Sequence, residues 1–247
     1  IQPSAVINAA AYTQVDAAES DQDAAFALNA EAPTKLAACC AQADVPLLHV
    51  STDYVFDGSA ERPYLEDDPT GPLNAYGASK LAGEEGIRAQ TAAHIILRTS
   101  WVYGPHMPNF VTTMLRLAEE KGGASVVDDQ IGAPTSALDI ADALLDIAHT
   151  VLDQSDQDLW GTYHFVAAGQ GSWADFAALI FERFDAHSGK TTELKRIATS
   201  AYPTPAARPL YSVLSTQKLS QIFGITPRDW TIAAQETLTR LLERGMR

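Results

Sequence analysis

Short apolar runs alternate with amphipathic stretches through the first hundred residues of the chain. Residues 5–9, 47–51 and 95–98 have the length and apolar content of buried strands. Between them, residues 22–43 and 75–90 show the spacing of apolar side chains that is typical of helices. Strands and helices that alternate in this order build a parallel sheet with helices on its faces. The first part of the chain therefore predicts a doubly wound α/β domain.

The pattern changes after residue 105, where the segments become mostly helical. A polar, acidic stretch over 153–158 is the best candidate for a linker. The segments beyond it predict a second, smaller lobe. We expect helices at 109–121, 136–152, 172–186 and 231–244, strands at 125–127 and 163–166, and a Pro-rich segment at 202–209.

Composition argues against several classes of function. The 247 residues carry a net charge of −14, from 31 acidic and 17 basic side chains, which disfavours a nucleic acid partner because phosphate binding needs a basic surface. No apolar run approaches the roughly 20 residues that cross a bilayer, and the first residues do not resemble a secretion signal. Cys39 and Cys40 are adjacent in an expected helix, where we expect two buried, unreactive thiols. These features favour a cytoplasmic protein.

The sharpest motif is a tyrosine and a lysine, Tyr76 and Lys80, on the helix expected at 75–90. Their spacing is about one helical turn, so the two side chains share a face. An ammonium beside a phenol favours the phenolate, which would lower the pKa of Tyr76 and let it exchange a proton near neutral pH. On its own, the spacing is also that of an ordinary exposed pair on a helix.

A second polar group stands at the end of the strand expected at 47–51. Ser51 and Thr52 lie at its carboxyl end, where open parallel sheets bind their ligands. A hydroxyl from either residue could hydrogen-bond the same carbonyl oxygen that Tyr76 would protonate. The alternative interpretation is that both residues belong to an ordinary turn after a strand.

Thr52, Tyr76 and Lys80 together resemble the Ser/Thr, Tyr and Lys triad of the extended short-chain dehydrogenase/reductase family. The resemblance covers nearly the whole chain and is most specific to the dTDP-4-dehydrorhamnose reductases. Its further motifs are Asn8 to Asp16 with Glu19, Asn29, Ser51 to Gly58, Pro72-Leu73-Asn74, Tyr76 to Glu84, Arg98 to Gly104, Asn109-Phe110, Asp129 to Thr135, Ala201 to Pro205 and Arg208-Pro209.

The resemblance implies a Rossmann-type doubly wound parallel sheet, lacking its first βαβ portion, with a smaller C-terminal α/β substrate lobe. Residues 1–155 would be the remaining part of the NAD(P)-binding domain, with 106–125 contributing to the substrate lobe. Residues 156–247 would form the substrate-binding lobe itself.

The resemblance also implies a reaction. NADPH or NADH would deliver hydride to the 4-keto group of dTDP-4-dehydro-6-deoxy-L-mannose while Tyr76 protonates the oxygen, and the product would be dTDP-L-rhamnose. Thr52 would polarise the oxygen, and Lys80 would keep Tyr76 acidic and bind the cofactor ribose. By the same resemblance, the cofactor would be lined by Ala11, Tyr12, Thr13, Val50, Tyr76 and Lys80, and the dTDP-sugar by Thr52, Asp53, Tyr54, Trp101, Asn109 and Arg208. A core role for Trp101 and a structural role for Arg208 are the alternatives.

Two parts of the family pattern are missing. The family opens with a glycine-rich turn that cradles the cofactor pyrophosphate, and no such segment precedes Ile1. We therefore expect the natural protein to extend upstream, and cofactor binding to be weak without that extension. Some members bind magnesium through clustered acids at a dimer contact, but Leu138 stands where one such acid is expected. The sequence thus does not support magnesium, its histidines predict no catalytic metal, and a homodimer is compatible with the resemblance without being determined by it.

One segment imitates a second dinucleotide-binding motif. Residues 169–174 fit the pattern G-x-G-x-x-A between an expected strand and helix, and Glu193 follows at about the distance of a ribose ligand. Ser172 and Asp175, however, have the spacing of an N-terminal capping box for the helix at 172–186. We favour the capping interpretation.

Two other functions share parts of this pattern. The fold and the Tyr76/Lys80 motif also resemble a non-catalytic regulatory subunit of methionine adenosyltransferase, although intact Ser51 to Tyr54 with Trp101 suits a sugar pocket. Nucleotide-sugar epimerases and dehydratases share the triad as well. Asp53 fits the dehydratase pattern, which however expects a second acid where Tyr54 stands.

Overall fold

The computed structural model describes residues 2–106, 108–154 and 159–243. The chain forms two compact units, each assembled from three stretches of sequence. The first unit comprises Ile1–Thr99, Ala141–Phe165 and Thr204–Thr226, and the second comprises Ser100–Ile140, Val166–Pro203 and Pro227–Arg247. The chain thus passes repeatedly between the units. Most of the predicted linker at 153–158 lies outside the described residues.

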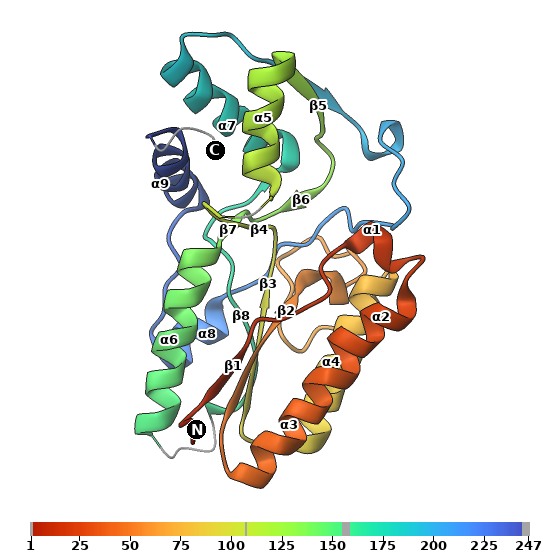
Figure 1. Ribbon diagram of the computed structural model, residues 1–247, viewed down its shortest axis with the longest axis vertical. Helices are drawn as coiled ribbons and strands as arrows, with labels where there is room; N and C mark the ends of the chain where they lie inside the picture. The colour runs from red at the N-terminus through yellow and green to blue at the C-terminus, as the bar shows by residue number, and fades with distance from the viewer. Residues whose placement is uncertain (1, 107, 155–158, 244–247) are drawn as a thin grey trace. The chain divides into compact units, whose positions relative to one another are not determined.

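A four-stranded parallel sheet forms the centre of the first unit (Figure 1). Its strands are β1 (Val6–Asn8), β2 (Leu47–Thr52), β3 (His94–Thr99) and β8 (Gly161–His164), in the order β1-β2-β3-β8. β3 is buried along its whole length and β2 along nearly all of it, as expected of strands with helices on both faces. The register pairs Asn8 with His49 and Thr52 with Thr99. The predicted α/β fold with a parallel sheet is confirmed.

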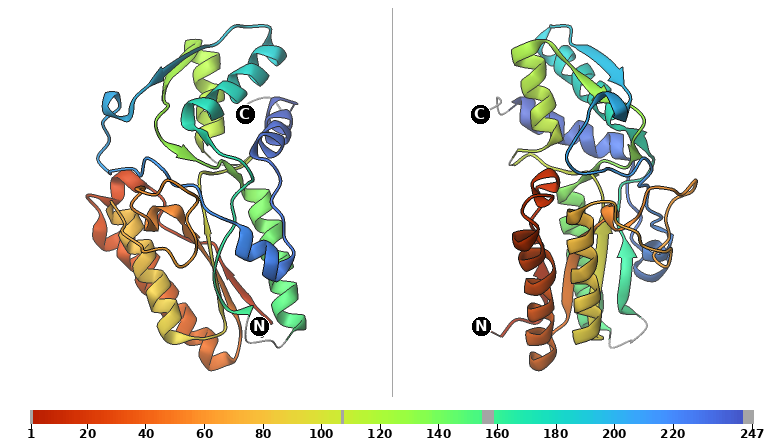
Figure 2. Two further views of the ribbon diagram at one scale, coloured as in Figure 1. Left: turned by 180° about the vertical axis from the view of Figure 1, so that it is seen from behind. Right: turned by 90° about the vertical axis from the view of Figure 1, so that its right-hand side faces the viewer.

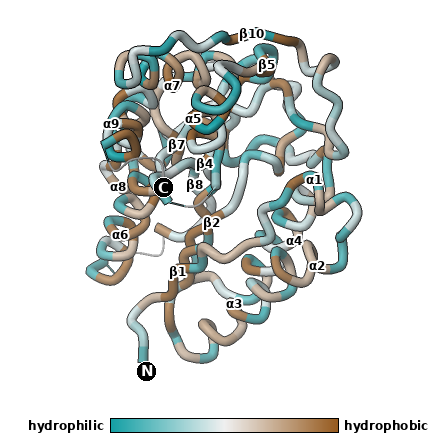
Figure 3. The backbone as a smooth tube through the Cα atoms, turned by 45° about the horizontal axis from the view of Figure 1, so that its top comes forward, coloured by the Kyte–Doolittle hydropathy of each residue, from teal (hydrophilic) through white to brown (hydrophobic). Residues whose placement is uncertain are grey.

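Helices cover both faces of this sheet. α3 (Ala32–Ala43) and α4 (Ala75–Gln90) lie on one face, and α6 (Ala137–Asp153), most of which belongs to this unit, lies on the other (Figures 1 and 2). In Figure 3 the strands of the sheet are mainly apolar, whereas polar and apolar positions alternate along the helices. A cluster of buried side chains joins α3 and α4 to the sheet: Ala37, Cys40, Leu47, Ile87 and Ile96.

The helix predicted at 22–43 is interrupted by a π-helical turn. It consists of α2 (Gln22–Phe26), the π-helical turn Ala27–Glu31 and α3. The turn directs the side chain of Asn29 inward, where it is buried. Its backbone carbonyl lies so close to Gly83 of α4 that a Cβ there would clash with it. Glycine at this position therefore allows α4 to approach the π-helical turn closely.

In the second unit, three helices pack around one apolar core. They are α5 (Phe110–Lys121), α7 (Trp173–Ser188) and α9 (Trp230–Glu243). Their amphipathic patterns were predicted within a few residues of these bounds. β5 (Gly123–Val127) pairs in parallel with β10 (Glu193–Ile197), and shorter pairs join β4 (Val102–Tyr103) to β7 (Thr135–Ser136) and β6 (Ile131–Gly132) to β9 (Gly171–Ser172).

The start of α7 decides between the two interpretations of the glycine-rich segment before it. Ser172 is the N-cap, and its hydroxyl accepts a hydrogen bond from the Asp175 N–H at 3.0 Å. The Asp175 carboxylate in turn accepts from the Ser172 N–H at 2.9 Å. This is the predicted capping box, which satisfies two of the N–H groups that a helix start leaves unpaired.

Several short elements have no clear signal in the sequence. They are α1 (Val15–Ala18), β10, α8 (Gln217–Phe223) and two 3-10 turns, Asp53–Val55 and Thr199–Ala201. The expectation of two buried thiols is wrong for Cys39, which is exposed, while Cys40 is buried. Across the described ranges, every helix is too short or too polar to cross a membrane.

Candidate active site

Thr52 is the last residue of β2 and connects the sheet to the residues around it. Its hydroxyl accepts from the Tyr54 N–H at 3.2 Å and thereby caps the short turn Asp53–Val55. The same hydroxyl donates to Asp53 Oδ1 at 3.1 Å and lies within hydrogen-bonding reach of the Tyr76 phenol. Ser51 neighbours Glu84 instead. Of the two predicted hydroxyls, the structure brings Thr52 to the tyrosine.

The first turn of α4 holds Tyr76 in place. Asn74 is its N-cap, and the side-chain oxygen accepts from the Gly77 N–H at 2.8 Å. Glu19 accepts from the first N–H of the helix at 2.7 Å. A Cβ at Gly77 would clash with the carbonyl oxygen of Tyr54, so glycine lets α4 begin directly against the turn after β2. The helix therefore presents Tyr76 beside Thr52 from its first turn.

Tyr76 is a protonated phenol at neutral pH. Burial raises its pKa to about 12, which outweighs the opposing effect of the hydrogen bond with Thr52. The sequence-based expectation that Lys80 lowers this pKa is wrong for this structure, because the lysine is hydrogen-bonded elsewhere. The protonated form is the one that can donate a proton to a developing alkoxide.

Lys80 is buried, with its side chain directed at the central strand. Its ammonium nitrogen donates to the Val50 carbonyl oxygen at 2.8 Å and lies 3.0 Å from His49 Nε2. Burial lowers the pKa of Lys80 to about 8, although the negative charge of Glu84 raises it. A lysine in this range changes its charge near physiological pH, unlike an ordinary surface lysine.

A buried ion pair stands one helical turn beyond Lys80. Glu84 is 0% exposed and Arg98 of β3 is 2% exposed. Arg98 donates to both carboxylate oxygens, from Nε at 2.9 Å and from Nη2 at 2.7 Å, and Arg88 adds a contact at 2.6 Å. Burial opposes ionisation of Glu84, but the hydrogen bonds and charge of Arg98 outweigh it and hold the pKa of Glu84 below its usual value. Glu84 therefore stays ionised behind Lys80, with its negative charge paired to Arg98 and Arg88.

Asp53 and Tyr54 differ in their exposure. Asp53 is 1% exposed, and burial raises its pKa to about 7, against hydrogen bonds from Ser212 and Thr52. Tyr54 is half-buried, and its ring packs edge-on against Tyr76 with centroids 5.7 Å apart. Tyr54 thus lies next to the proposed acid, whereas the Asp53 carboxyl is covered by protein.

Arg208 lies near this cluster but is held by an ion pair. Its Nη1 and Nη2 donate to the two carboxylate oxygens of Asp16 at 3.0 and 2.8 Å, and Nη1 also donates to the Ala206 carbonyl at 3.0 Å. The hydrogen bond to Arg208 lowers the pKa of Asp16. Both charges act on Tyr54, which places the ion pair close to that tyrosine.

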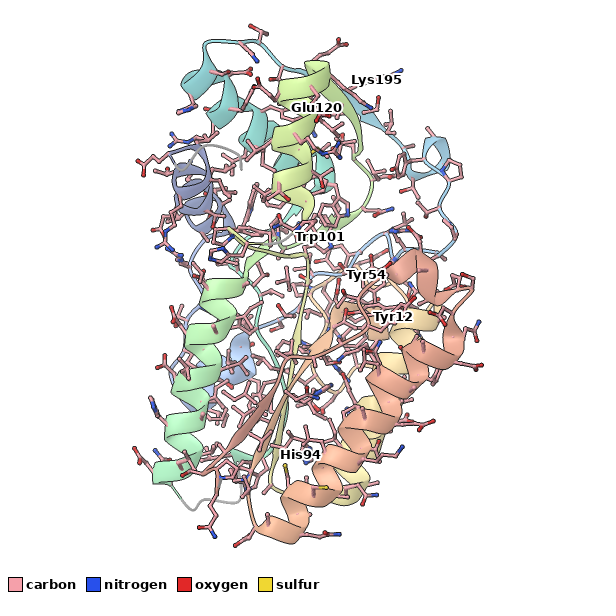
Figure 4. The ribbon with its side chains drawn as sticks, viewed as in Figure 1. Tyr12, Tyr54, His94, Trp101, Glu120 and Lys195 are labelled. Carbon is pink, nitrogen blue, oxygen red and sulfur yellow. The ribbon has the colours of Figure 1, made fainter. Side chains whose placement is uncertain are left out.

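The residues expected to line a cofactor follow β1 and end β2. Asn29 holds the loop after β1: its Oδ1 accepts from the Tyr12 N–H at 2.7 Å, and its Nδ2 donates to the Tyr12 carbonyl at 3.0 Å and to Ser79 at 3.0 Å. Tyr12 and Tyr54 lie toward the carboxyl end of the sheet, and His94 at the start of β3 lies at the opposite end (Figure 4).

This edge of the sheet suits the nicotinamide and ribose of a dinucleotide. The Asn29 side chain holds the loop with Ala11, Tyr12 and Thr13 through the backbone of Tyr12, and Val50 belongs to the neighbouring strand β2. Lys80 and Tyr76 provide hydrogen-bond donors for hydroxyl groups. These are the residues that would hold a cofactor at the end of β2.

Two predicted substrate residues belong to the second unit, each with a structural role there. Trp101 has a positive φ of 48° and stacks on Trp173, with centroids 3.7 Å apart. Gly132 lies against its indole ring, where any Cβ would clash. Asn109 is the N-cap of α5; its Oδ1 accepts from the Val111 N–H at 2.9 Å, and its Nδ2 donates to the Gly104 carbonyl at 2.8 Å.

Comparison with known proteins agrees with this geometry. The sequence model of the family described as RmlD substrate binding domain matches residues 1–243. A dTDP-4-dehydrorhamnose reductase of Sinorhizobium fredii is 44% identical over 243 residues, which cover 98% of this chain and 82% of the relative. The chain belongs to this family of dTDP-4-dehydrorhamnose reductases. The dTDP-4-dehydrorhamnose reductase of Escherichia coli K12 is 42% identical over 243 residues, covering 98% of this chain and 81% of the relative.

Solved structures of dTDP-4-dehydrorhamnose reductases share the fold. The structure from Bacillus anthracis, in complex with NADP, aligns with a TM-score of 0.88 at 34% identity and covers 97% of this chain and 82% of that one. The structure from Clostridium acetobutylicum aligns with a TM-score of 0.86 at 38% identity, covering 97% and 81%. The family resemblance seen in the sequence is confirmed, and NAD(P)H is the cofactor of this family of oxidoreductases.

Sequence reasoning missed the partners of the candidate site residues. His49, Ser212 and Asp16 contact Lys80, Asp53 and Arg208 respectively. A histidine inside the otherwise apolar strand at 47–51 was the one available signal, because a buried polar side chain needs a partner. Among the described residues, no three histidine, cysteine or acidic side chains gather as metal ligands.

Proposed function

We propose that the protein is an NAD(P)H-dependent reductase that converts the 4-keto group of dTDP-4-dehydro-6-deoxy-L-mannose into the hydroxyl of dTDP-L-rhamnose. The observation that carries the proposal is the proximity of Thr52 to Tyr76 at the carboxyl end of a parallel sheet. It is supported by membership of the dTDP-4-dehydrorhamnose reductase family. When bound, reduced nicotinamide supplies the hydride for C4 of the sugar.

The chain supplies the proton and the polar contacts. Tyr76 donates its phenolic proton to the oxygen on C4, and Thr52 hydrogen-bonds the same oxygen, so that the negative charge never develops fully. The high pKa of Tyr76 keeps it protonated until the carbonyl oxygen becomes basic. Lys80 would bind the cofactor ribose and return a proton to Tyr76 after each turnover.

The remaining roles extend this proposal to the substrate and cofactor. Tyr54 is suited to contact the sugar because it is half-buried beside Tyr76, and Asp53 would act mainly through Thr52. Arg208 would exchange the Asp16 carboxylate for the diphosphate, since a guanidinium binds both groups in the same way. Trp101 and Asn109 are proposed substrate residues from the second unit. Ala11, Tyr12, Thr13 and Val50 would line the nicotinamide.

The larger organisation is proposed on the same basis. Residues 1–155 would bind the cofactor, with 106–125 contributing to the substrate lobe formed by 156–247. We also propose a cytoplasmic homodimer. Sedimentation velocity at micromolar concentration tests the oligomeric state, and a monomer would contradict the proposed dimer without affecting the proposed reaction.

Replacing Tyr76 by phenylalanine tests the reaction. With the 4-keto sugar nucleotide and NADPH, we expect Tyr76→Phe to lower kcat by a factor of about 10² to 10⁴, the usual effect of losing a general acid. The matched control is Tyr103→Phe in the second unit, which removes a phenol that is 1% exposed, and we expect kcat to stay unchanged. Consumption of NADPH at the wild-type rate by Tyr76→Phe would show that this residue is not the acid.

A further inference from the structure

Trp101 has a backbone conformation that bulky residues rarely adopt. Its φ of 48° lies in the left-handed region, where a side chain is strained. Hydrogen bonds to one neighbouring segment hold it there. The Trp101 carbonyl oxygen accepts from the Thr135 N–H at 3.2 Å, and the hydroxyl of Ser100 donates to the Ala133 carbonyl oxygen at 3.0 Å. Because such strain persists only where the surroundings enforce it and is frequent at functional sites, the contacts of the Trp101 ring are informative.

Trp173 covers one face of the Trp101 indole. The two rings are nearly parallel, with an interplanar angle of 7° and centroids 3.7 Å apart. Trp173 is itself fixed, because it is the first residue of α7, directly after the Ser172 cap, and Phe110 packs against it with centroids 4.6 Å apart. A ligand therefore cannot stack on this face of Trp101 without displacing Trp173.

Gly132 covers the opposite face of the same indole. A Cβ at Gly132 would lie nearest to Cε2 of Trp101 and 2.7 Å from both Cζ2 and Nε1, the two atoms bonded to Cε2 on the outer side, so it would lie over the ring face and not beyond its edge. Its three nearest atoms all belong to Trp101, which puts Gly132 on the side away from Trp173. The antiparallel pairing of β6 with β9 sets Gly132 opposite Gly171, two residues before Trp173. We call Trp173 and Gly132 together the clamp.

The clamp leaves the edge of the Trp101 indole for a ligand. Trp101 is half-buried. None of the residues that the structure describes accepts a hydrogen bond from its Nε1–H, and this nitrogen is not one of the polar atoms that the protein encloses without a partner. An indole nitrogen is a donor only, and it usually finds an acceptor when it is covered. The Nε1–H of Trp101 is therefore suited to an oxygen atom of a bound ligand.

We propose that Trp173 and Gly132 are positioning residues that clamp Trp101, so that its N–H edge and not a ring face meets the sugar of the substrate. The inference rests on the proposed role of Trp101 in binding the sugar nucleotide. Hydrogen bonds are directional, so a donor held in a fixed plane orients a sugar oxygen as well as binding it. An indole that is free to turn loses this orientation. The alternative is that the clamp serves only the packing of the second unit, in which case it would not distinguish a ligand with a sugar from one without.

Proton–nitrogen NMR of the indole N–H groups tests the contact directly. The chain has four tryptophans and therefore four indole signals, and the Trp101 signal is the one that is lost in Trp101→Phe. We expect dTDP-L-rhamnose to shift the Trp101 signal, and dTDP, which lacks the sugar, to leave it in place. Equal shifts with both ligands would overturn the proposal, and so would a Trp101 signal that dTDP-L-rhamnose does not shift at any concentration.

Two variants test the clamp from opposite faces of the indole. Trp173→Leu removes the stacked ring, and Gly132→Ala pushes a methyl group against the other face. By isothermal titration calorimetry, we expect each to raise the Kd for dTDP-L-rhamnose about two- to tenfold, the effect of losing one neutral hydrogen bond, and to leave the Kd for dTDP within about twofold of wild type. The matched control is Trp160→Leu, which removes a half-buried tryptophan of the first unit and should change neither Kd. Weaker binding of both ligands alike, or of neither, in the two clamp variants would show that the clamp only supports the fold.

A double variant tests whether Trp173 acts through Trp101. Trp101→Phe keeps an aromatic ring but removes the N–H, so adding Trp173→Leu to it should raise the Kd for dTDP-L-rhamnose no further. Additive losses would mean that Trp173 acts on the ligand by another route and would overturn the proposal.

These binding measurements are independent of the proposed reduction. If dTDP-L-rhamnose binds as expected but wild type does not consume NADPH with the 4-keto sugar nucleotide, the reduction fails and the clamp stands. If wild type reduces the sugar but both clamp variants bind dTDP-L-rhamnose as wild type does, the clamp fails and the reduction stands.

Discussion

The buried ion pair of Glu84 and Arg98 offers a quantitative test of how the first unit is held together. In Glu84→Gln, the carboxylate that accepts from Arg98 at 2.9 and 2.7 Å becomes a neutral amide. Arg98 is 2% exposed, so water cannot replace the lost partner. Removing one member of a buried pair costs about 3–5 kcal/mol, because the other charge is left uncompensated. Such a loss is a large fraction of the stability of an ordinary domain, about 5–15 kcal/mol.

Urea denaturation followed by far-ultraviolet circular dichroism measures the effect. The matched control is Glu31→Gln, which removes an exposed pair with Lys35 whose side chains are 64% and 76% exposed. An exposed pair one helical turn apart contributes only about 0.3–0.5 kcal/mol, so this variant should unfold almost as wild type does. A loss below about 1 kcal/mol in Glu84→Gln would refute the argument.

A double variant separates the lost pair from lost packing. In Glu84→Met with Arg98→Met, no charge is left buried, and apolar side chains of similar length fill the space. We expect the double variant to be more stable than Glu84→Gln, because replacing a buried pair by apolar groups is often neutral or stabilising. If the single and the double variant lose the same free energy of unfolding, the ion pair stabilises the fold by more than the neutralisation of its two charges.

Two further predictions concern other candidate residues. Asn109→Ala should lower the free energy of unfolding by about 1 kcal/mol through loss of the α5 cap, whereas Asn109→Ser should keep most of it; a raised KM for the sugar nucleotide in the serine variant would reveal a separate substrate contact. Burial raises the pKa of Asp53 to about 7, so the folded protein keeps a proton that the unfolded chain loses near pH 4. The contribution of the protonated Asp53 carboxyl to the free energy of unfolding is therefore fully present below about pH 4 and is lost as the pH rises to 7. Compared with Asp53→Asn in urea titrations at pH 5 and 8, wild type should lose stability at the higher pH, and parallel curves would contradict the buried, protonated carboxyl.

Local patterns in the sequence predicted the scaffold well. The helix at 75–90 has the predicted bounds, and the capping box of Ser172 and Asp175 forms as expected, because both depend on residues close together in the chain. The parallel sheet followed from the alternation of apolar runs with helices. These predictions needed only periodicity and the hydrogen-bonding needs of helix ends.

Such local patterns do not predict contacts between distant segments. Asp16 and Arg208 are 192 positions apart, and His49 and Lys80 are 31 apart, so nothing local relates one partner to the other. The expectation that Lys80 lowers the pKa of Tyr76 was wrong for the same reason. Helical spacing correctly put Tyr76 and Lys80 on one face, but the partner of the ammonium was decided by a strand behind the helix.

In the proposed reaction, the order of the pKa values would let one site serve the reduction repeatedly. Tyr76, with a pKa of about 12, gives up its proton only to a strongly basic oxygen, and the phenolate left behind is a stronger base than the amine of Lys80, whose pKa is about 8. The proposed return of a proton from Lys80 to Tyr76 would therefore be downhill. Lys80, which is buried with His49 as its neighbour, would then have to regain a proton in the proposed reaction. Because burial both raises the pKa of Tyr76 and lowers the pKa of Lys80, the same burial would favour both proposed proton transfers.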